Sequence, residues 1–406
     1  MKEKNLKAIG ASNKMDKKMD NMEVGRKFDL YFVDENVGKG LPLLLPKGAT
    51  IRRVLERFII DEELKRGYQH VFTPDMAKQD LFKISGHWPL YKDSMYPPMK
   101  VGDSNLLLKP MTCPFHITMF QHQPRSYNDL PIKFAELAHQ FRREQSGELH
   151  GLIRVAMFTL ADGHIFCTMK QSQEEFKKVV DLIQHVMKCL GVKNYWYRLS
   201  LRDKTKDKYL GDDDMWDKAE DALRNAMDDL GLKYVEEKGH AAFYGPKLDV
   251  QVRNTYGKED TLITNQFDFQ LPKKFGLEYV DSDGKKKMPV IIHRSSIGCI
   301  ERTMAFLFEQ YQGEFPFWLS PVQVKVMSMN DEIVPYAKEI EAQITAAGFR
   351  VEGDYRNESI QKKTRDAQLE LIPVVIVIGN KEKEKDTLAV RFRGSKKVEF
   401  GMKFDD

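Results

Sequence analysis

The chain has 406 residues and a formal net charge of +4, the difference between 64 Lys and Arg residues and 60 Asp and Glu residues. Its hydrophobic fraction of 42% can fill a large core and excludes global disorder. At roughly 100–200 residues per domain, the length predicts two or three domains. The near balance of charge gives no sign of a concentrated cationic surface, but it does not exclude a nucleic-acid binder whose charges are sorted onto one face.

The four cysteines do not form a disulfide framework. Cys113, Cys167, Cys189 and Cys299 include no C-x-x-C pair and are too sparse for such a scaffold. We therefore expect a reduced, cytoplasmic protein. The most apolar stretches, such as Pro373–Gly379, are far shorter than the ~20 residues that span a bilayer, so no membrane partner is predicted.

Residues 1–24 are predicted to be a basic, flexible tail. The first 20 residues are rich in lysine, but they contain Glu3, Asp16 and Asp20 and lack an apolar run. They therefore fit neither a signal peptide nor a transit peptide. Order is expected to begin near Phe28–Val33.

The following residues predict many strands and few crossover helices. Thr50 is the expected N-cap of a helix that ends near Gly67. Further helices are predicted over Gln171–Leu190, Asp212–Leu230 and Ile297–Tyr311. The expected strands are Tyr68–Thr73, Asn105–Lys109, Ile132–Arg143, Leu152–Phe158, Ala241–Val252, Leu262–Phe269 and Pro289–Ile292. This order predicts an α+β domain with an antiparallel sheet flanked by helices.

The segment Gly313–Pro321 contains two prolines and a glycine and indicates a domain boundary. We expect a first domain at residues 25–316 and a second at 317–406. In the second domain the expected elements alternate as Val322–Met329 (strand), Glu332–Ala347 (helix), Arg350–Asp354 (strand), Ile360–Leu371 (helix), Val374–Ile378 (strand) and Leu388–Arg393 (strand). This βαβαβ order predicts a smaller α/β domain with a mostly parallel sheet.

Cationic residues near strand ends are the first candidates for chemistry. Arg142, Arg154, Lys247 and Arg302 could bind phosphate, since the guanidinium fork matches phosphate oxygens. Surface ion pairing is the alternative for each of them. Glu144 follows Arg142 in a polar turn and could equally be a solvated acid.

Cys113, His164 and His293 form a second candidate set. One thiolate and two imidazoles suit zinc. The three residues are separated by 51 and 129 positions, so no local spacing indicates a site. A buried thiol and two hydrogen-bonded histidines remain the alternative at this point.

Several segments in matching order resemble the threonyl-tRNA synthetases of class II, over about residues 25–406. Pro74 stands where motif 1 of that family has its dimer-interface proline. The other matching segments are Pro110–Pro114 (first zinc segment), Phe141–Gly151 with Arg154 (motif 2), Asp162–Cys167 (second zinc ligand), Tyr244–Lys247 and Gln266–Phe269 (active-site strands), and His293–Arg302 (third zinc ligand and motif 3).

The resemblance implies ATP-dependent activation of L-threonine to threonyl-adenylate and transfer to tRNA(Thr). Arg142 would hold the α-phosphate of ATP and Arg302 the γ-phosphate end, with Mg²⁺ bridging the phosphates. With Lys247, these arginines are the implied catalytic residues. The implied ATP-binding set is Arg142, Glu144, Arg154, Phe158, Lys247 and Arg302, with Glu144 at the adenine amino group and Phe158 stacked on the base.

The resemblance also implies one zinc ion per chain, held by Cys113, His164 and His293. Three protein ligands leave positions open for the amino and hydroxyl groups of threonine. A site that must bind a hydroxyl rejects valine far better than an apolar pocket does. Asp162, Tyr244 and Gln266 would complete the amino-acid pocket.

The second domain resembles the anticodon-binding domain of several class II synthetases. Asn357, Glu382 and Arg391 stand where that domain reads anticodon bases. The implied assembly is a homodimer through the motif 1 region near Pro74.

Several positions depart from the family pattern. Leu160 and Thr261 replace glutamines, and the remaining departures are Ala156 and Met157 for Arg-Gly, Asp260 for tryptophan and Cys299 for a small polar residue. These departures leave open a non-translating paralogue that binds threonine or RNA. A zinc hydrolase is disfavoured because no general-base carboxylate is spaced with the ligands. The chain starts at the catalytic domain and stops shortly after Arg391, so we expect neither the family's editing region nor its final helix.

Overall fold

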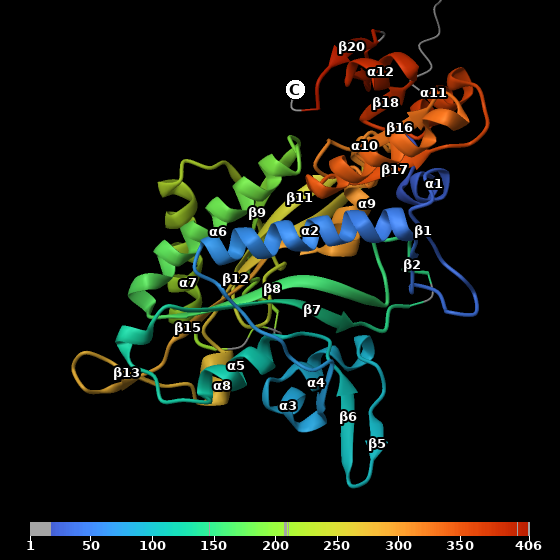
Figure 1. Ribbon diagram of the computed structural model, residues 1–406. Helices are drawn as coiled ribbons and strands as arrows, with labels where there is room; N and C mark the ends of the chain where they lie inside the picture. Colours follow the sequence, from blue (N-terminus) through green and yellow to red (C-terminus); the bar gives the residue numbers. More distant parts are fainter. Residues whose placement is uncertain (1–17, 146, 207–208, 210, 396, 405–406) are drawn as a thin grey trace, which may run out of the picture.

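The computed structural model describes residues 18–404 except 146, 207–208, 210 and 396. The described residues form a large domain built on an eight-stranded sheet and a smaller domain, drawn in orange and red, near the carboxyl end (Figure 1). This architecture confirms the predicted α+β domain followed by a smaller α/β domain.

The large sheet is mostly antiparallel. Its strands lie in the order β10-β9-β11-β12-β15-β8-β7-β3, with parallel pairing at the outer pairs β10–β9 and β3–β7. The strands are β3 (Gln69–His70), β7 (Ile132–Phe141), β8 (Met157–Cys167), β9 (Tyr195–Leu201), β10 (Tyr234–Lys238), β11 (Lys247–Arg253), β12 (Glu259–Asp268) and β15 (Val290–Cys299).

Long helices cover one face of this sheet. They are α2 (Pro46–Lys65), α6 (Met169–Cys189), α7 (Asp213–Asp229) and α9 (Ile300–Tyr311). Ala161 and Ile165 of β8 and Ile292 of β15 pack with these helices in the largest hydrophobic core. Because successive strand side chains point to opposite faces, the neighbouring Asp162, His164 and His293 lie on the other face.

Shorter elements lie on that other face, below the sheet in Figure 1. They include α3 (Gln79–Ile84), α4 (His87–Tyr91), α5 (Cys113–Gln121) and α8 (Leu271–Phe275). The strands β4 (Met76–Lys78), β5 (Met99–Val101) and β6 (Ser104–Leu108) form a small sheet, and two pairs, β1 (Tyr31–Phe32) with β2 (Leu43–Leu44) and β13 (Tyr279–Val280) with β14 (Lys286–Lys287), complete the domain. The long sheet strands are therefore enclosed from both sides.

The predicted tail extends too far toward the carboxyl end. Helix α1 spans Asn21–Lys27, and the Asp20 carboxylate caps it by accepting from the Glu23 backbone N–H. Asn21 donates to the carboxylate of Glu309 at 2.9 Å, and Val24 is fully buried. Order therefore begins before Phe28, because a capping box and buried contacts hold this short helix. Residues 1–17 lie outside the described part of the chain.

Several predicted boundaries in the large domain are also wrong; the helix predicted from Ile297, for example, begins only at Ile300, after β15 ends at Cys299. Helix α2 begins at Pro46, where the fixed φ of proline suits the first helical turn, so Thr50 lies inside the helix. Residues 152–156 are not strand, since β8 begins at Met157. Leu152 and Val155 are buried there as loop anchors, and their separation of three residues is not the period of a strand.

The small domain contains a five-stranded sheet in the order β17-β16-β18-β19-β20. Its elements are β16 (Val324–Ser328), α10 (Val334–Ala346), β17 (Val351–Asp354), α11 (Ile360–Leu369), β18 (Val374–Ile378), α12 (Asn380–Lys385), β19 (Leu388–Phe392) and β20 (Glu399–Met402). Strands β17, β16 and β18 are parallel to one another, whereas β19 pairs antiparallel with β18 and β20 pairs antiparallel with β19. The sheet is therefore mixed rather than mostly parallel, because α12 is too short to return β19 in the parallel direction.

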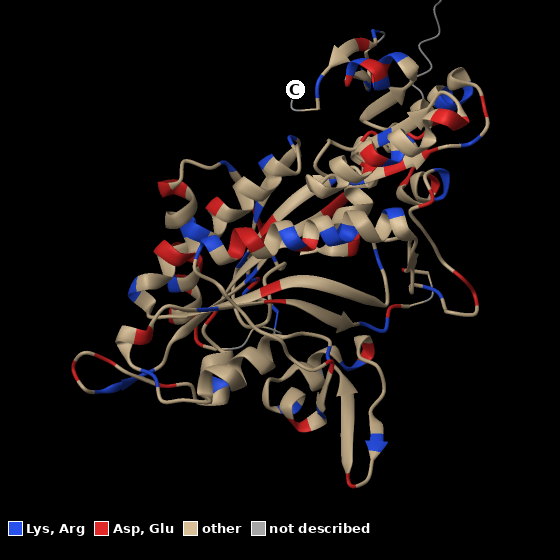
Figure 2. Cartoon of the chain, viewed as in Figure 1, with Lys and Arg blue, Asp and Glu red and all other residues tan. Residues whose placement is uncertain are grey.

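Charges of both signs are interspersed over the helices and loops in Figure 2. This view agrees with the near balance of the composition. Among the described residues, no helix has the length and apolarity needed to span a bilayer.

Candidate active site

Two adjoining cavities lie on the face of the sheet opposite α6 and α9. Their volumes are about 360 and 240 Å³, and Arg142, Leu160 and Gln266 line both. The larger cavity is lined by Cys113, Asp162, His164, Tyr244, Lys247 and His293 of the predicted site. The smaller one is lined by Glu144, Arg154, Phe158 and Arg302. The structure thus brings every site residue predicted for the first domain into one continuous cleft.

The candidate metal ligands meet in the larger cavity. His164 of β8 and His293 of β15 are cross-strand partners, and Cys113 approaches them from the start of α5. Their ligand atoms all lie within 4.8 Å of one another, and all three residues are buried. Antiparallel pairing of β8 with β15 therefore unites residues that the sequence separates widely.

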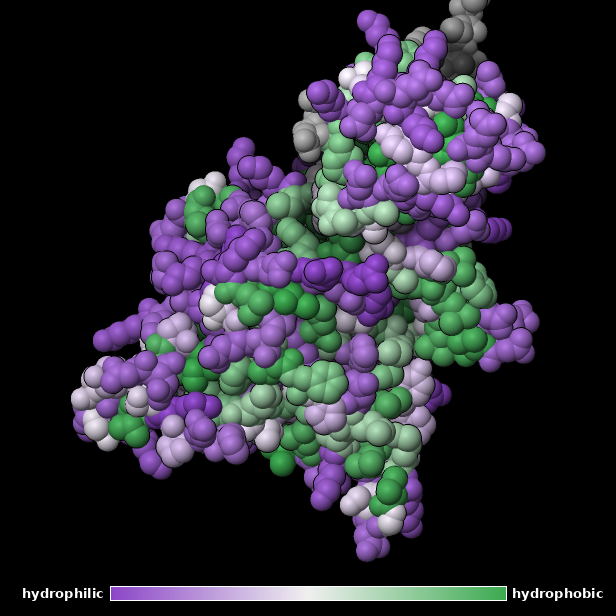
Figure 3. Space-filling view, viewed as in Figure 1, coloured by the Kyte–Doolittle hydropathy of each residue, from purple (hydrophilic) through white to green (hydrophobic). Residues whose placement is uncertain are grey.

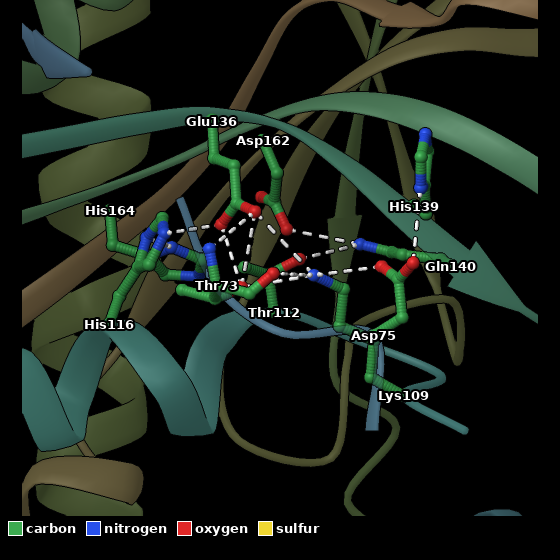
Figure 4. Close-up of polar contacts among 10 residues, drawn as sticks. All are labelled: Thr73, Asp75, Lys109, Thr112, His116, Glu136, His139, Gln140, Asp162 and His164. Carbon is green, nitrogen blue, oxygen red and sulfur yellow. Dashed lines mark hydrogen bonds and ion pairs between the residues drawn. The ribbon is translucent and has the colours of Figure 1, made fainter. Parts of the chain in front are cut away.

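A second histidine fixes the ring of His164 (Figure 4). The Nδ1 atoms of His164 and His116 are 2.8 Å apart, and Nε2 of His116 lies 3.3 Å from the Glu136 carboxylate. Thr73 donates to the same carboxylate from its backbone N–H and its hydroxyl. With two neutral imidazoles, protons on Nδ1 of His164 and Nε2 of His116 satisfy the whole chain. This leaves Nε2 of His164 available to a metal.

Asp268 supports His293 in the same way. Its carboxylate lies 2.8 Å from Nε2 of His293 and also accepts from the backbone N–H groups of Gln270 and Leu271. Nδ1 of His293 is then the nitrogen left for a metal. Histidine ligands in proteins usually have their other nitrogen bound in this manner, so the donor set and its supports fit a zinc ion.

Burial controls protonation in the cluster. Burial raises the pKa of the Cys113 thiol, and the charges of Asp162 and Asp268 raise it further. Burial also lowers the pKa of His164, which keeps its imidazole in the neutral, ligating form. A divalent cation would supply the positive charge that the buried thiolate requires.

The predicted amino-acid residues surround the cluster. Tyr244 stacks on His293 with ring centroids 5.1 Å apart and donates from its hydroxyl to Oε1 of Gln266. Asp162 lies close by, and its Oδ2 accepts from Nε2 of Gln140 at 3.1 Å. Burial raises the pKa of Asp162, and the charges of His116 and His293 oppose this shift.

The smaller cavity is lined by two guanidinium groups, those of Arg142 and Arg302, and among the described residues no carboxylate forms an ion pair with either of them. Arg142 lies over the Phe158 ring, 5.0 Å from its centroid. Burial lowers the pKa of Arg142, and the charge of Arg302 lowers it further. Arg302 donates to the backbone carbonyls of Ile153 and Thr261, both at 3.1 Å. The two cations therefore form a ready site for a polyanion.

Other predicted ATP contacts pair with protein carboxylates. Arg154 binds Glu144 at 2.7 Å and Glu148 at 3.1 Å, so two of the predicted residues hold each other. Lys247 binds Asp249 at 2.7 Å. These side chains are fixed at the rim and wall of the cleft by their partners.

Comparisons with known proteins agree with this geometry. Residues 98–311 match the family model of the tRNA synthetase class II core domain (G, H, P, S and T), and residues 323–406 match that of the anticodon binding domain. The threonyl-tRNA synthetase structure from Cryptosporidium parvum Iowa II, described as its RNA binding domain, superposes with a TM-score of 0.90 and 38% identity, over 95% of this chain and 96% of that one. The chain belongs to the threonyl-tRNA synthetase family.

Curated relatives give the same family. The threonine–tRNA ligase of Geobacillus sp. (strain WCH70) is 49% identical over 392 residues, which cover 96% of this chain and 61% of that protein. That of Lactobacillus helveticus (strain DPC 4571) is 48% identical and covers 100% of this chain and 63% of its own length. The chain thus spans about three fifths of the length of these relatives. A prolyl-tRNA synthetase from Cryptosporidium parvum, 16% identical with a TM-score of 0.69, shares the fold.

Three of the departures, Leu160, Thr261 and Cys299, line the smaller cavity. Leu160 packs with Val155, Phe158 and Cys299 in a small apolar cluster. Thr261 accepts from the side-chain amide of Gln251 at 2.8 Å. The wall next to Phe158 is therefore apolar at Leu160.

The predicted anticodon contacts do not all lie at one end of the small sheet. Asn357 and Glu382 follow the carboxyl ends of β17 and β18, and Asn357 is exposed. Arg391 pairs with Val375, near the opposite end of β18. The carboxylate of Glu382 also accepts from the backbone N–H of Gly379 at 3.0 Å, which fixes the start of α12.

Four site residues escaped the sequence analysis: His116, Glu136, Gln140 and Asp268. Three of them, His116, Gln140 and Asp268, have a signal in their spacing. His116 lies three residues after Cys113 on one helix, so the two share a face. Gln140 and Asp268 lie two residues from Arg142 and Gln266, so each shares a strand face with a predicted site residue.

Proposed function

We propose that the chain is a threonine–tRNA ligase that activates L-threonine with ATP and transfers it to tRNA(Thr). The observation that carries this proposal is the Cys113–His164–His293 cluster next to the Arg142–Arg302 cavity, in a member of this family. The catalytic unit would be residues 25–316, extended by α1, and the anticodon-binding unit residues 317–406.

The amino-acid pocket is the larger cavity. Cys113, His164 and His293 would hold one zinc ion, which supplies Lewis-acid sites for the amino and hydroxyl groups of threonine. Asp162 would accept a hydrogen bond from the substrate, and Tyr244 and Gln266 would close the pocket over it. A hydroxyl-binding pocket of this kind selects threonine over valine.

The smaller cavity would bind ATP with its Mg²⁺. Arg142 would hold the α-phosphate at the reacting bond, and Arg302 the γ-phosphate end. Phe158 would stack on adenine, with Glu144 at its amino group and Arg154 fixing Glu144. Lys247 lines the larger cavity and would hold the carboxylate of threonine near the α-phosphate.

The chemical step needs positioning and charge neutralisation. The threonine carboxylate attacks the α-phosphorus and pyrophosphate leaves. A hydroxyl of the 3′-terminal ribose of the tRNA then attacks the acyl carbon of threonyl-adenylate, the bond to phosphate breaks, and AMP leaves. Arg302 is held by two backbone carbonyls and Arg142 lies over the Phe158 ring before substrate arrives, so both would stabilise the developing phosphate charge with little reorganisation.

The small domain would read the tRNA anticodon. Asn357, Glu382 and Arg391 are the proposed contacts. Asn357 is free to meet a base because it is exposed, whereas Glu382 would have to share its carboxylate with the Gly379 N–H.

We also propose a homodimer through the motif 1 region near Pro74. The Phe72 side chain is 84% exposed, and Leu64 of α2 and Met76 of β4 are also exposed. Hydrophobic surface is visible beneath α2 in Figure 3. Burial of these exposed apolar side chains between two copies of the chain would favour a dimer. Sedimentation velocity should give twice the chain mass of 47.2 kDa, whereas a monomer at micromolar concentration would contradict this arrangement.

The test of the proposed function is ATP–pyrophosphate exchange followed by tRNA charging. Purified protein should exchange pyrophosphate only when threonine is added and should then charge tRNA(Thr). Exchange without charging would favour the alternative, a non-translating paralogue that binds threonine or RNA. Absence of exchange in protein that contains zinc would contradict the proposed ligase.

A further inference from the structure

Gln140 is a buried amide in the wall of the larger cavity. It lies on β7, two residues before Arg142, and its side chain is 1% exposed. It lines the cavity together with the candidate metal ligands and Asp162. None of the roles assigned above uses it.

The orientation of this amide follows from its neighbours (Figure 4). Nε2 donates to Oδ2 of Asp162 at 3.1 Å and to Oγ1 of Thr112 at 3.2 Å. The Thr112 hydroxyl in turn bonds Asp162. A flipped amide would place its oxygen against a carboxylate, so the amino group must face Asp162.

The amide oxygen is left without a partner. Among the described residues, Oε1 of Gln140 is buried and has no hydrogen-bond donor. Buried acceptors are almost always satisfied, so an unpaired oxygen in a cavity wall indicates a group that arrives with a ligand. The amino acid that occupies this cavity carries two kinds of donor, an ammonium and a hydroxyl.

We propose that Gln140 is a further contact for the bound amino acid, with Oε1 accepting a hydrogen bond from its ammonium or hydroxyl group while Nε2 holds Asp162. The inference rests on the proposed function, since it requires threonine in the larger cavity. Gln140 would thus contact the substrate from β7, in the same cavity that Tyr244 and Gln266 line.

The test compares Gln140→Met with two other variants in the exchange assay. Methionine keeps the length of the side chain and removes both polar atoms. Thr112→Val removes a support of Asp162 but leaves Oε1 in place. Gln121→Met replaces an exposed glutamine at the end of α5 and is the matched control.

Gln140→Met should raise the KM for threonine at least about fivefold, because losing a hydrogen bond from the neutral hydroxyl has about this effect and losing one from the charged ammonium has a larger one. The KM for ATP should change less than about twofold and the zinc content should not change. Thr112→Val should raise the KM for threonine less, and Gln121→Met should leave it unaltered. An equal rise for L-2-aminobutyrate, which lacks the hydroxyl, assigns Oε1 to the ammonium; a rise for threonine alone assigns it to the hydroxyl.

An unchanged KM for threonine in Gln140→Met would overturn the inference. An equal rise in Thr112→Val would also overturn it, because Gln140 would then act only through Asp162. In both cases the wild-type protein remains active with threonine. A wild type that shows no threonine-dependent exchange would instead overturn the proposed function and this inference with it, so the two failures are distinguishable.

Discussion

Replacing Cys113 with alanine is expected to remove the bound zinc and to lower threonine-dependent exchange at least ~100-fold. Removing a residue that only supports a metal ligand typically lowers metal affinity or activity 10–100-fold. Removing one of the three ligands themselves should lower both by more. The remaining histidines lie within 4.8 Å of the vacated position and are each held by a hydrogen bond, so they cannot move to replace the sulfur. Zinc content by metal analysis and the exchange rate are the two readouts.

Cys189→Ala is the matched control for this variant. Cys189 is half-buried at the end of α6, with its sulfur 3.6 Å from His185 and away from the cleft. Its replacement should leave zinc content and exchange unchanged. Full zinc content in Cys113→Ala would refute the ligand set.

Replacing Arg142 with alanine is expected to lower exchange by about 10²–10³-fold, the usual effect of removing one preorganised group that stabilises transition-state charge. The loss should appear in kcat with threonine and ATP both saturating, since the α-phosphate gains charge as the bond to pyrophosphate breaks. Zinc content should be unaffected, because Arg142 contacts none of the three ligands in the hydrogen bonds of the described residues.

The folded state should tolerate this change. The pKa of Arg142 is lowered by burial and by Arg302, so the bare protein holds its charge unfavourably. The melting temperature of Arg142→Ala should therefore stay within about 3 °C of the wild type. Arg143→Ala, at the exposed neighbouring position, is the control and should retain activity. Equal losses in both variants, or unfolding of Arg142→Ala, would contradict the assigned role.

Strand alternation made much of the cleft predictable. The apolar residues of β8, Ala161 and Ile165, had to face the core, so Asp162 and His164 had to share the opposite face. The distance in sequence between His164 and His293 carried no such information. Their meeting depends on which strands pair, and the register of β8 with β15 is a tertiary outcome.

Other features depended on contacts that sequence periodicity does not record. Helix α1 is held by a hydrogen bond from Asn21 to Glu309, almost 300 residues away. Because no local pattern records this contact, the lysine-rich sequence up to Val24 predicted a flexible tail. Leu152 and Val155 are buried because they anchor a loop, not because they belong to a strand. Glu136 supports His164 only through His116, so no spacing rule could connect them.

The central claim is that a zinc-bearing pocket selects threonine by its hydroxyl group. The most direct measurement is the ratio of kcat/KM for threonine to that for valine in ATP–pyrophosphate exchange by the zinc-loaded protein. A site that binds the hydroxyl should give a ratio of about 10⁴ or more. A ratio of about 10² or less, the discrimination that an apolar pocket achieves, would contradict the account.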